Sequence, residues 1–141
     1  MPKIERLAVT SLEYVLPQGQ AYGNARGLNN RRSMSLIAVE TDGGVTGYGD
    51  AAGPLGVVRE YIKLLTPSFI GRSLYDFEIV AAGIRNKLYH FGSQGHFVAA
   101  LGGINIAVFD AMGKTLGVPV HDLLGGRRTD RLACYATTGY F

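Results

Sequence analysis

The segment that most constrains the fold is residues 100–125, which read ALGGINIAVFDAMGKTLGVPVHDLLG. Its nearly unbroken apolar character predicts one long helix over residues 96–116. Gly117 suits the left-handed position that follows a helix, and Pro119 prevents the helix from resuming. Small residues recur at every fourth position of this helix: Ala99, Gly103, Ala107 and Ala111. Such a stripe lets another backbone approach closely, so we expect the helix to be packed on more than one face. Asp110 and Lys114 are four residues apart and should form a favourable pair on it.

The first third of the chain predicts an antiparallel meander of three strands. Apolar alternation marks strands over residues 3–15, 33–41 and 45–50. The sequence Asp42-Gly43-Gly44 is a hairpin turn signal between the last two strands. Residues 17–32 read as a polar loop rich in glycine and asparagine. Loops of this length in compact domains are usually functional or disordered.

Helical spacing replaces alternation in the rest of the chain. Residues 54–65 predict one helix, and residues 73–89 predict a second helix with Ser73 as its N-cap. The long apolar helix follows, and residues 131–138 return to a strand-like pattern. Strands followed by helices predict an α+β fold, with a three-stranded antiparallel meander followed by a three-helix bundle.

Several motifs carry a resemblance to a known family. The apolar helix with its Gly-Val-Pro end, the strand end Gly47-Tyr48-Gly49-Asp50 and the turn Phe69-Ile70-Gly71-Arg72 resemble those of the mandelate racemase and muconate lactonizing enzymes, within the enolase superfamily. The resemblance implies an enolase N-terminal domain-like capping domain over residues 1–128. Residues 129–141 would then begin a (β/α) barrel domain, so the chain would end at the first strand of a missing TIM barrel. Three places depart from the family's commoner residues: Asp50, Asn105 and Ser73-Leu74.

The resemblance also implies a parent reaction. The parent would be a Mg²⁺-dependent racemase or dehydratase that abstracts the proton alpha to a carboxylate, on a hydroxy acid or an acid sugar. The Mg²⁺ ligands and the base would come from the missing barrel, so this chain alone would be inactive and holds no assigned catalytic or metal-binding residue. The alternative is a non-catalytic stand-alone fragment or assembly module. Racemase, dehydratase and cycloisomerase remain open as reaction branches.

In the superfamily, the polar loop and the segment 50–57 close over the barrel mouth and contact the distal part of the substrate. The resemblance therefore makes the polar side chains of this loop candidates for substrate binding. They are Tyr22, Asn24, Arg26, Asn29 and Asn30. A guanidinium here suits a second carboxylate or a polyol, because its fork is geometrically selective. The alternative is a solvated loop whose charges bind nothing specific.

Other constellations favour structural roles. The glycines of residues 47–53 superficially resemble a dinucleotide-binding loop, but their strand belongs to a hairpin, so we expect them to permit close backbone approach. His90, His96 and His121 lack the spacing of metal ligands and are expected to be structural or surface residues. We expect Cys134 to be a small buried residue on a strand rather than a nucleophile.

Composition and charge restrict the classes of partner that the chain is expected to bind. The chain is 47% hydrophobic and 18% charged, which is enough apolar material for a core. Its net charge of +3 is not clustered on a basic face, which argues against nucleic acid as a partner. We expect no signal peptide, no membrane span and a cytoplasmic location. The partners expected are a small carboxylate substrate and further copies of the chain in a homo-oligomer, because the unpaired strand 131–138 invites association.

Overall fold

The computed structural model describes residues 1–92 and 94–135, with the side chain of Asn24 outside the description. The main sheet has three antiparallel strands in the order β1-β4-β5. These strands are Ile4–Val15, Arg31–Thr41 and Thr46–Ala51. A second, two-stranded sheet pairs β2 (Tyr22–Asn24) with β3 (Gly27–Asn29). The three-stranded meander predicted from the sequence is confirmed.

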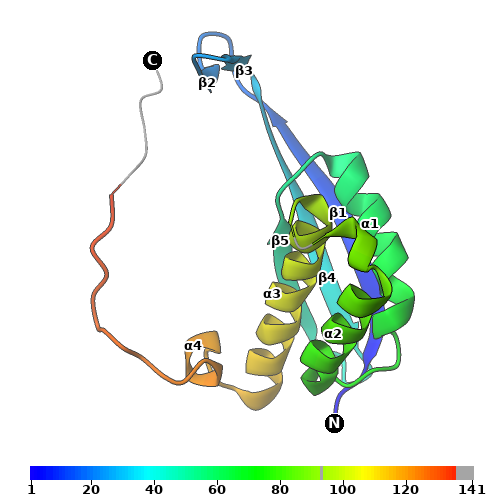
Figure 1. The fold of residues 1–141 in the computed structure, drawn as a ribbon. Helices are drawn as coiled ribbons and strands as arrows, with labels where there is room; N and C mark the ends of the chain where they lie inside the picture. Colours follow the sequence, from blue (N-terminus) through cyan, green and yellow to red (C-terminus); the bar gives the residue numbers. More distant parts are fainter. Residues whose placement is uncertain (93, 136–141) are drawn as a thin grey trace.

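The helices cover one face of the main sheet (Figure 1). They are α1 (Leu55–Phe69), α2 (Phe77–Lys87), α3 (His96–Leu116) and the short α4 (Val120–Leu123). Single 3₁₀ turns at Leu74–Asp76 and Tyr89–Phe91 flank α2. The α+β architecture with three main helices is as predicted, and α3 has the predicted bounds. Gly117 adopts the left-handed conformation that ends α3, with φ 68° and ψ 27°.

The core lies between the sheet and the helices. Successive side chains of a strand point to opposite faces, so β4 directs Ile37 and Val39 toward the helices, where both are fully buried. The helices meet them with a continuous set of buried side chains: Val58, Ile62 and Leu65 of α1 and Leu101, Ile104 and Val108 of α3. Met34, on the other face of β4, is exposed. This core fixes which face of the sheet carries the helices.

α3 approaches β5 so closely that the strand requires glycine. A Cβ at Gly49 would clash with the carbonyl oxygen of Gly103 and would lie 2.8 Å from the backbone nitrogen of Ala107. A Cβ at Gly47 would clash with the carbonyl oxygen of Ala107. Both expectations are therefore confirmed: the small residues of α3 admit a second backbone, and the glycines of the strand end permit that approach.

The first helix runs four residues beyond its predicted end. α1 continues through Pro67 to Phe69, whose side chain is buried in the core. Proline removes one backbone donor, but close to a helix end that loss is small beside the burial of a phenylalanine. Tertiary packing therefore decides this boundary.

The second helix starts later than predicted. Ser73 Oγ accepts a hydrogen bond of 3.3 Å from the backbone N–H of Tyr75, so it caps a 3₁₀ turn rather than α2 itself. α2 begins only at Phe77. Asp76 occupies the N-cap position of α2 without a side-chain capping hydrogen bond. The capping signal was located correctly, but the tighter turn delays the helix by one turn.

The predicted strand after α4 does not form in the described part of the chain. Residues 131–135 have no strand pairing, and residues 136–138 lie outside the described residues. Leu132 and Tyr135 are strongly exposed. Cys134 is also exposed, so the expectation of a buried strand cysteine is wrong. A strand forms by pairing its backbone groups with a neighbour, and no described strand lies beside this segment.

α3 also satisfies a length and composition test for a membrane span, with a mean hydropathy of 1.4 in its most apolar window. That window is 56% buried inside the protein. A helix that is apolar on most of its sides is typical of a core element packed from several directions. The contacts of α3 with β5, β4 and α1 account for its composition in this way.

Candidate functional site

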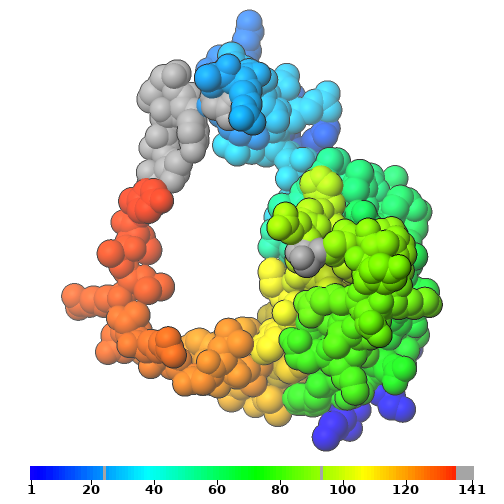
Figure 2. Space-filling view, viewed as in Figure 1, coloured from blue at the N-terminus to red at the C-terminus, as the bar shows by residue number. Residues whose placement is uncertain are grey.

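The residues predicted to bind substrate lie on a projection of the sheet (Figure 1). β5 ends opposite Ser35, whereas the pairing of β1 with β4 continues outward to Val15 and Arg31. The outermost residues of these two strands therefore pair only with each other, and the β2–β3 hairpin stands at their end. We call residues 12–34 the arm and residues 20–30 its tip. In space-filling view the arm extends beyond the helical body (Figure 2).

The segment predicted as a polar loop is thus more regular than expected. Residues 17–32 contain β2, β3 and the start of β4. Pairing of Tyr22 with Asn29 closes the small hairpin. Its strands are too short and too polar to show apolar alternation, so periodicity could not detect them. The hairpin gives the predicted candidates a defined order along the tip.

Tyr22 joins the tip to β4. The guanidinium carbon of Arg32 lies 3.3 Å from the centroid of the Tyr22 ring. The Tyr22 hydroxyl donates a hydrogen bond of 3.2 Å to the carbonyl oxygen of Arg31. A cation above an aromatic face is attracted by the ring quadrupole. Arg32 was missed as a site residue, because the only signal was a pair of adjacent arginines and its stacking partner is set by tertiary folding.

Asn29 and Arg31 fix the base of the tip. Asn29 Oδ1 accepts a hydrogen bond of 2.9 Å from the backbone N–H of Arg31. The Arg31 guanidinium forms an ion pair of 2.6 Å with Glu13 on the neighbouring strand. An exposed pair of this kind contributes about 0.2–1 kcal/mol. These contacts orient the tip on the arm and add little to the stability of the fold.

Arg26 and Asn30 are exposed at the tip, as is Asn29. Arg26 lies in the turn between β2 and β3, and Asn30 lies between β3 and β4, where its carbonyl oxygen accepts a hydrogen bond of 2.7 Å from the backbone N–H of Leu16. Asn24 is the last residue of β2. All five predicted candidates therefore lie on one hairpin, with Arg26 at its turn.

The segment 50–57 lies at the same end of the sheet as the arm. In an antiparallel meander the end of β1, the start of β4 and the end of β5 lie at the same end of the sheet. Ala51 pairs with Ser35, directly below the arm. Gly53 has φ 137°, and a Cβ there would lie 2.6 Å from His96 Nδ1 at the start of α3. The two segments that the family resemblance assigns to substrate capping thus lie at the same end of the sheet.

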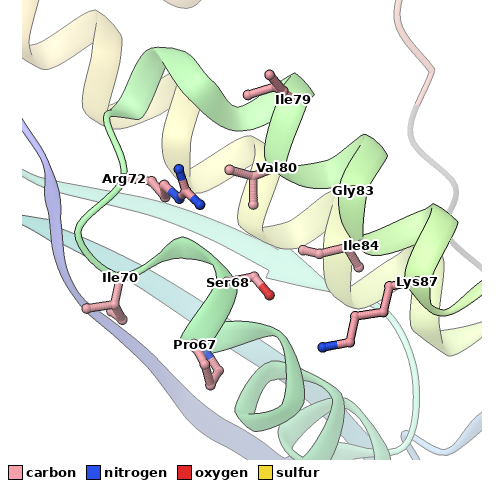
Figure 3. Close-up of a pocket in the computed structure, with 9 residues that line it drawn as sticks. All are labelled: Pro67, Ser68, Ile70, Arg72, Ile79, Val80, Gly83, Ile84 and Lys87. Carbon is pink, nitrogen blue, oxygen red and sulfur yellow. The ribbon is translucent and has the colours of Figure 1, made fainter.

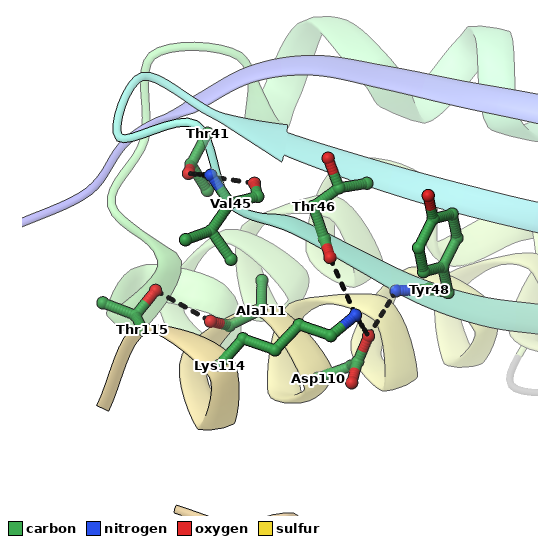
Figure 4. A network of polar contacts seen from close by, with 8 residues as sticks. All are labelled: Thr41, Val45, Thr46, Tyr48, Asp110, Ala111, Lys114 and Thr115. Carbon is green, nitrogen blue, oxygen red and sulfur yellow. Dashed lines mark hydrogen bonds and ion pairs between the residues drawn. The ribbon is translucent and has the colours of Figure 1, made fainter. Parts of the chain in front are cut away.

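A polar network holds β5, and with it the segment 50–57, against α3 (Figure 4). Asp110 Oδ2 accepts a hydrogen bond of 2.7 Å from the backbone N–H of Tyr48. Lys114 Nζ donates to the carbonyl oxygen of Thr46 at 2.9 Å and pairs with Asp110 at 2.6 Å. The Asp110–Lys114 pair is as predicted. The strand contacts were missed, because they join residues far apart in sequence.

Residues 1–92 and 94–135 offer no group of three or more His, Cys, Asp or Glu side chains that could hold a metal ion. His90 lies in a 3₁₀ turn against the ring of Phe91, His96 opens α3, and His121 lies in α4. All three histidines are exposed and belong to different elements. The described residues therefore present a polar arm and a neighbouring turn, without a metal centre.

Comparison with known proteins gives this arrangement a family. The model described as mandelate racemase / muconate lactonizing enzyme, N-terminal domain, matches residues 12–125. The D-galactarolactone cycloisomerase of Agrobacterium fabrum is 32% identical over 111 residues, which cover 79% of this chain and 29% of that protein. The L-rhamnonate dehydratase of Saccharopolyspora erythraea is 34% identical over 126 residues, which cover 87% of this chain and 31% of that protein.

Solved structures agree with these matches. The 3,6-anhydro-D-galactonate cycloisomerase from Zobellia galactanivorans superposes with a TM-score of 0.76 at 25% identity, over 89% of this chain and 32% of that one. An isomerase from Streptomyces coelicolor A3(2) superposes with a TM-score of 0.72 at 28% identity, and the match covers 92% of this chain and 32% of that one. The chain thus spans about a third of the length of each relative. The chain belongs to the family of mandelate racemase and muconate lactonizing enzyme N-terminal domains, within the enolase superfamily.

Proposed function

We propose that this chain is the substrate-capping domain of a Mg²⁺-dependent enolase-superfamily enzyme, a racemase or dehydratase that removes the proton alpha to a carboxylate. The observation that carries the proposal is the position of the tip and the segment 50–57 at one end of the sheet. Two segments at the same end of the sheet can cover an adjoining active site together. The family match supports a barrel as the domain that they cover.

A capping domain assists the reaction by excluding water from the active site. An alpha proton beside a carboxylate is weakly acidic, so its removal depends on strong electrostatic stabilisation of the enediolate that forms. Electrostatic contacts are stronger when water is expelled from the site. In the proposed enzyme the tip closes over the substrate, and Arg26 binds a distal carboxylate or polyol with its planar guanidinium. Tyr22, Asn24, Asn29 and Asn30 are proposed to line the same contact.

The substrate class follows from the relatives' names. They include a cycloisomerase of D-galactarolactone and dehydratases of L-rhamnonate and D-galactonate. We therefore propose a small hydroxy acid or acid sugar as the substrate of the complete enzyme. A cytoplasmic location suits a metabolic enzyme of this kind.

The Mg²⁺ ion and the catalytic base are proposed to lie outside these residues. Mg²⁺ prefers converging oxygen ligands, and the described residues provide no cluster of carboxylates for it. The described residues therefore do not fit a Mg²⁺ site, and we propose no catalytic residue among them. The proposed contribution of the chain is to exclude water and to select the substrate.

Exchange of the alpha proton tests the proposal that the catalytic groups lie outside this chain. The chain alone and the longer protein that contains it are incubated with Mg²⁺, mandelate and a panel of acid sugars in deuterated water. We expect NMR to detect deuterium incorporation only with the longer protein. Incorporation above background by the chain alone would contradict the assignment. A gene that encodes no barrel after Phe141 would instead favour the alternative, a non-catalytic module.

The role of the tip is tested in the complete enzyme. Arg26→Ala should lower kcat/KM for the best substrate about ten- to hundredfold, since loss of a hydrogen bond to a charged group costs about 1.5–3 kcal/mol. Tyr22→Phe should also lower kcat/KM for the best substrate. Both variants should still fold. Arg59→Ala is the matched control, because Arg59 is an exposed arginine on α1. Equal kinetics for all variants would show that the tip is merely solvated.

A further inference from the structure

α2 presents an exposed face beside a groove of ≈ 480 Å³ that separates it from α1. Figure 3 shows Ile79, Val80 and Ile84 of α2 among the residues that line this groove. Ile79 is 75% exposed. A single exposed isoleucine is ordinary on a protein surface, so it indicates nothing by itself. The charged residues around Ile79 distinguish this surface.

Acidic residues stand at the start of α2 and basic residues at its end. Asp76 and Glu78 are followed, beyond Ile79, by Arg85 and Lys87. None of the four forms an ion pair with another part of residues 1–92 and 94–135. The surface is therefore charged with opposite signs at its two ends, and both signs are available to an outside partner.

The spacing of these charges is that of a self-complementary surface. Asp76 and Lys87 are separated by about three helical turns, and Glu78 and Arg85 by about two, so each acid and base share one side of the helix. Both pairs are also centred on the same point, between Ala81 and Ala82. A single two-fold axis at that point would bring every acid opposite a base of an antiparallel copy.

We propose that a second copy of this chain docks on this face, with the two α2 helices antiparallel about a two-fold axis near Ala82. Glu78 then faces the partner's Arg85, and Asp76 faces the partner's Lys87. A two-fold interface is isologous, so each contact occurs twice. The antiparallel arrangement also places the positive start of each helix dipole near the negative end of the other.

The apolar centre of this face suits the same arrangement. Ile79 lies level with the partner's Ile84, next to the partner's Gly83. A Cβ built at Gly83 meets no atom within 4 Å, so the space above this glycine is open. Ala82, nearest the axis, is small enough for two helices to approach. Docking would bury the exposed Ile79 of both copies, which supplies a favourable apolar term in addition to the charges.

Reversal of one charge at a time provides the test. In sedimentation experiments at low salt, the wild-type chain should show concentration-dependent dimerisation. Glu78→Lys and Arg85→Glu should each weaken it roughly tenfold, because like charges then meet twice in every dimer. An equimolar mixture of the two variants should recover wild-type affinity, since each variant then meets the opposite charge. Arg59→Glu, the same change on α1, is the control and should leave association unchanged.

A crosslink locates the axis. Ala82→Cys in a Cys134→Ser background should form a disulfide-linked dimer rapidly under mild oxidation, because the two copies of residue 82 meet near the axis. Lys63→Cys, on the exposed face of α1, should crosslink slowly. A wild-type chain that stays monomeric would overturn the proposal. So would a variant mixture that associates no more tightly than its separate components, or equal crosslinking at residues 63 and 82.

Discussion

The carboxylate of Asp110 accepts a hydrogen bond of 2.7 Å from the backbone N–H of Tyr48, which lies 62 residues earlier in the chain. β5 is an edge strand, so this N–H has no strand partner on that side. Lys114, one helical turn further along α3, donates to the carbonyl oxygen of Thr46. One pair of helix side chains therefore satisfies both a donor and an acceptor of the sheet edge, and it anchors the strand that leads into the segment 50–57.

Asp110→Ala should lower the free energy of unfolding by about 1–2 kcal/mol, because a charge-assisted hydrogen bond is lost from a partly exposed site. Urea denaturation measures this change, and hydrogen exchange at the Tyr48 amide should accelerate. Asp130→Ala is the control, since its side chain is 87% exposed and pairs with Arg127, three residues away. Equal losses in the two variants would show that the edge contact contributes nothing.

Alanine substitution at two neighbouring glycines of α3 should change the free energy of unfolding in opposite directions. A Cβ at Gly103 would clash with Ile37 and would lie 2.8 Å from the carbonyl oxygen of Asp50, so Gly103→Ala should destabilise the protein by about 1–3 kcal/mol or more. A Cβ at Gly102 meets nothing within 4 Å, so Gly102→Ala should stabilise the helix by about 0.5–1 kcal/mol. Thermal melting of both variants measures the difference. The close packing of α3 on β5 predicts that the two melting temperatures move apart.

Arg32→Ala should loosen the tip without unfolding the domain. The stack on Tyr22 is an exposed cation–π contact of about 0.5–1 kcal/mol, so its loss should speed hydrogen exchange of the β2–β3 amides roughly two- to fivefold. Arg32→Lys keeps the charge but lacks the planar guanidinium, and it should give an intermediate effect. If exchange rates are the same in all three proteins, the stack does not order the tip.

Removal of residues 127–141 should change the free energy of unfolding by less than about 0.5 kcal/mol. The contacts of residues 127–135 are local, as in the pair of Arg127 with Asp130. Truncation before Val118 should destabilise more, because it also removes α4 and Leu123, which packs on the core. Urea denaturation of the two truncated chains and the full chain measures these differences in the free energy of unfolding.

Light scattering on the chain truncated after Gly126 separates two modes of association. The unpaired backbone of the tail predicts that truncation reduces self-association. Association through α2 does not involve the tail and should persist. Unchanged scattering after truncation would show that the tail makes no contribution.

The candidate site was only partly predictable. The resemblance located the polar segment, and its five candidates do lie together on the tip. Tyr22 and Asn29 are also engaged in contacts within the arm, with Arg31 in both cases. Substrate binding by these residues stays a prediction. Arg32 could not be found from the sequence, because the register of β1, β4 and the hairpin decides which ring it meets.

The sequence by itself determined the order of the three main strands and the three main helices, the bounds of α3 and the need for close packing on its small residues. These features are local, since they depend on periodicity, capping and turn chemistry over a few residues. Tertiary structure decided the length of α1, the two strands within the tip and the contact of Asp110 with β5. It also decided the exposure of Cys134, because a strand-like pattern remains unpaired where no neighbouring strand supplies backbone partners.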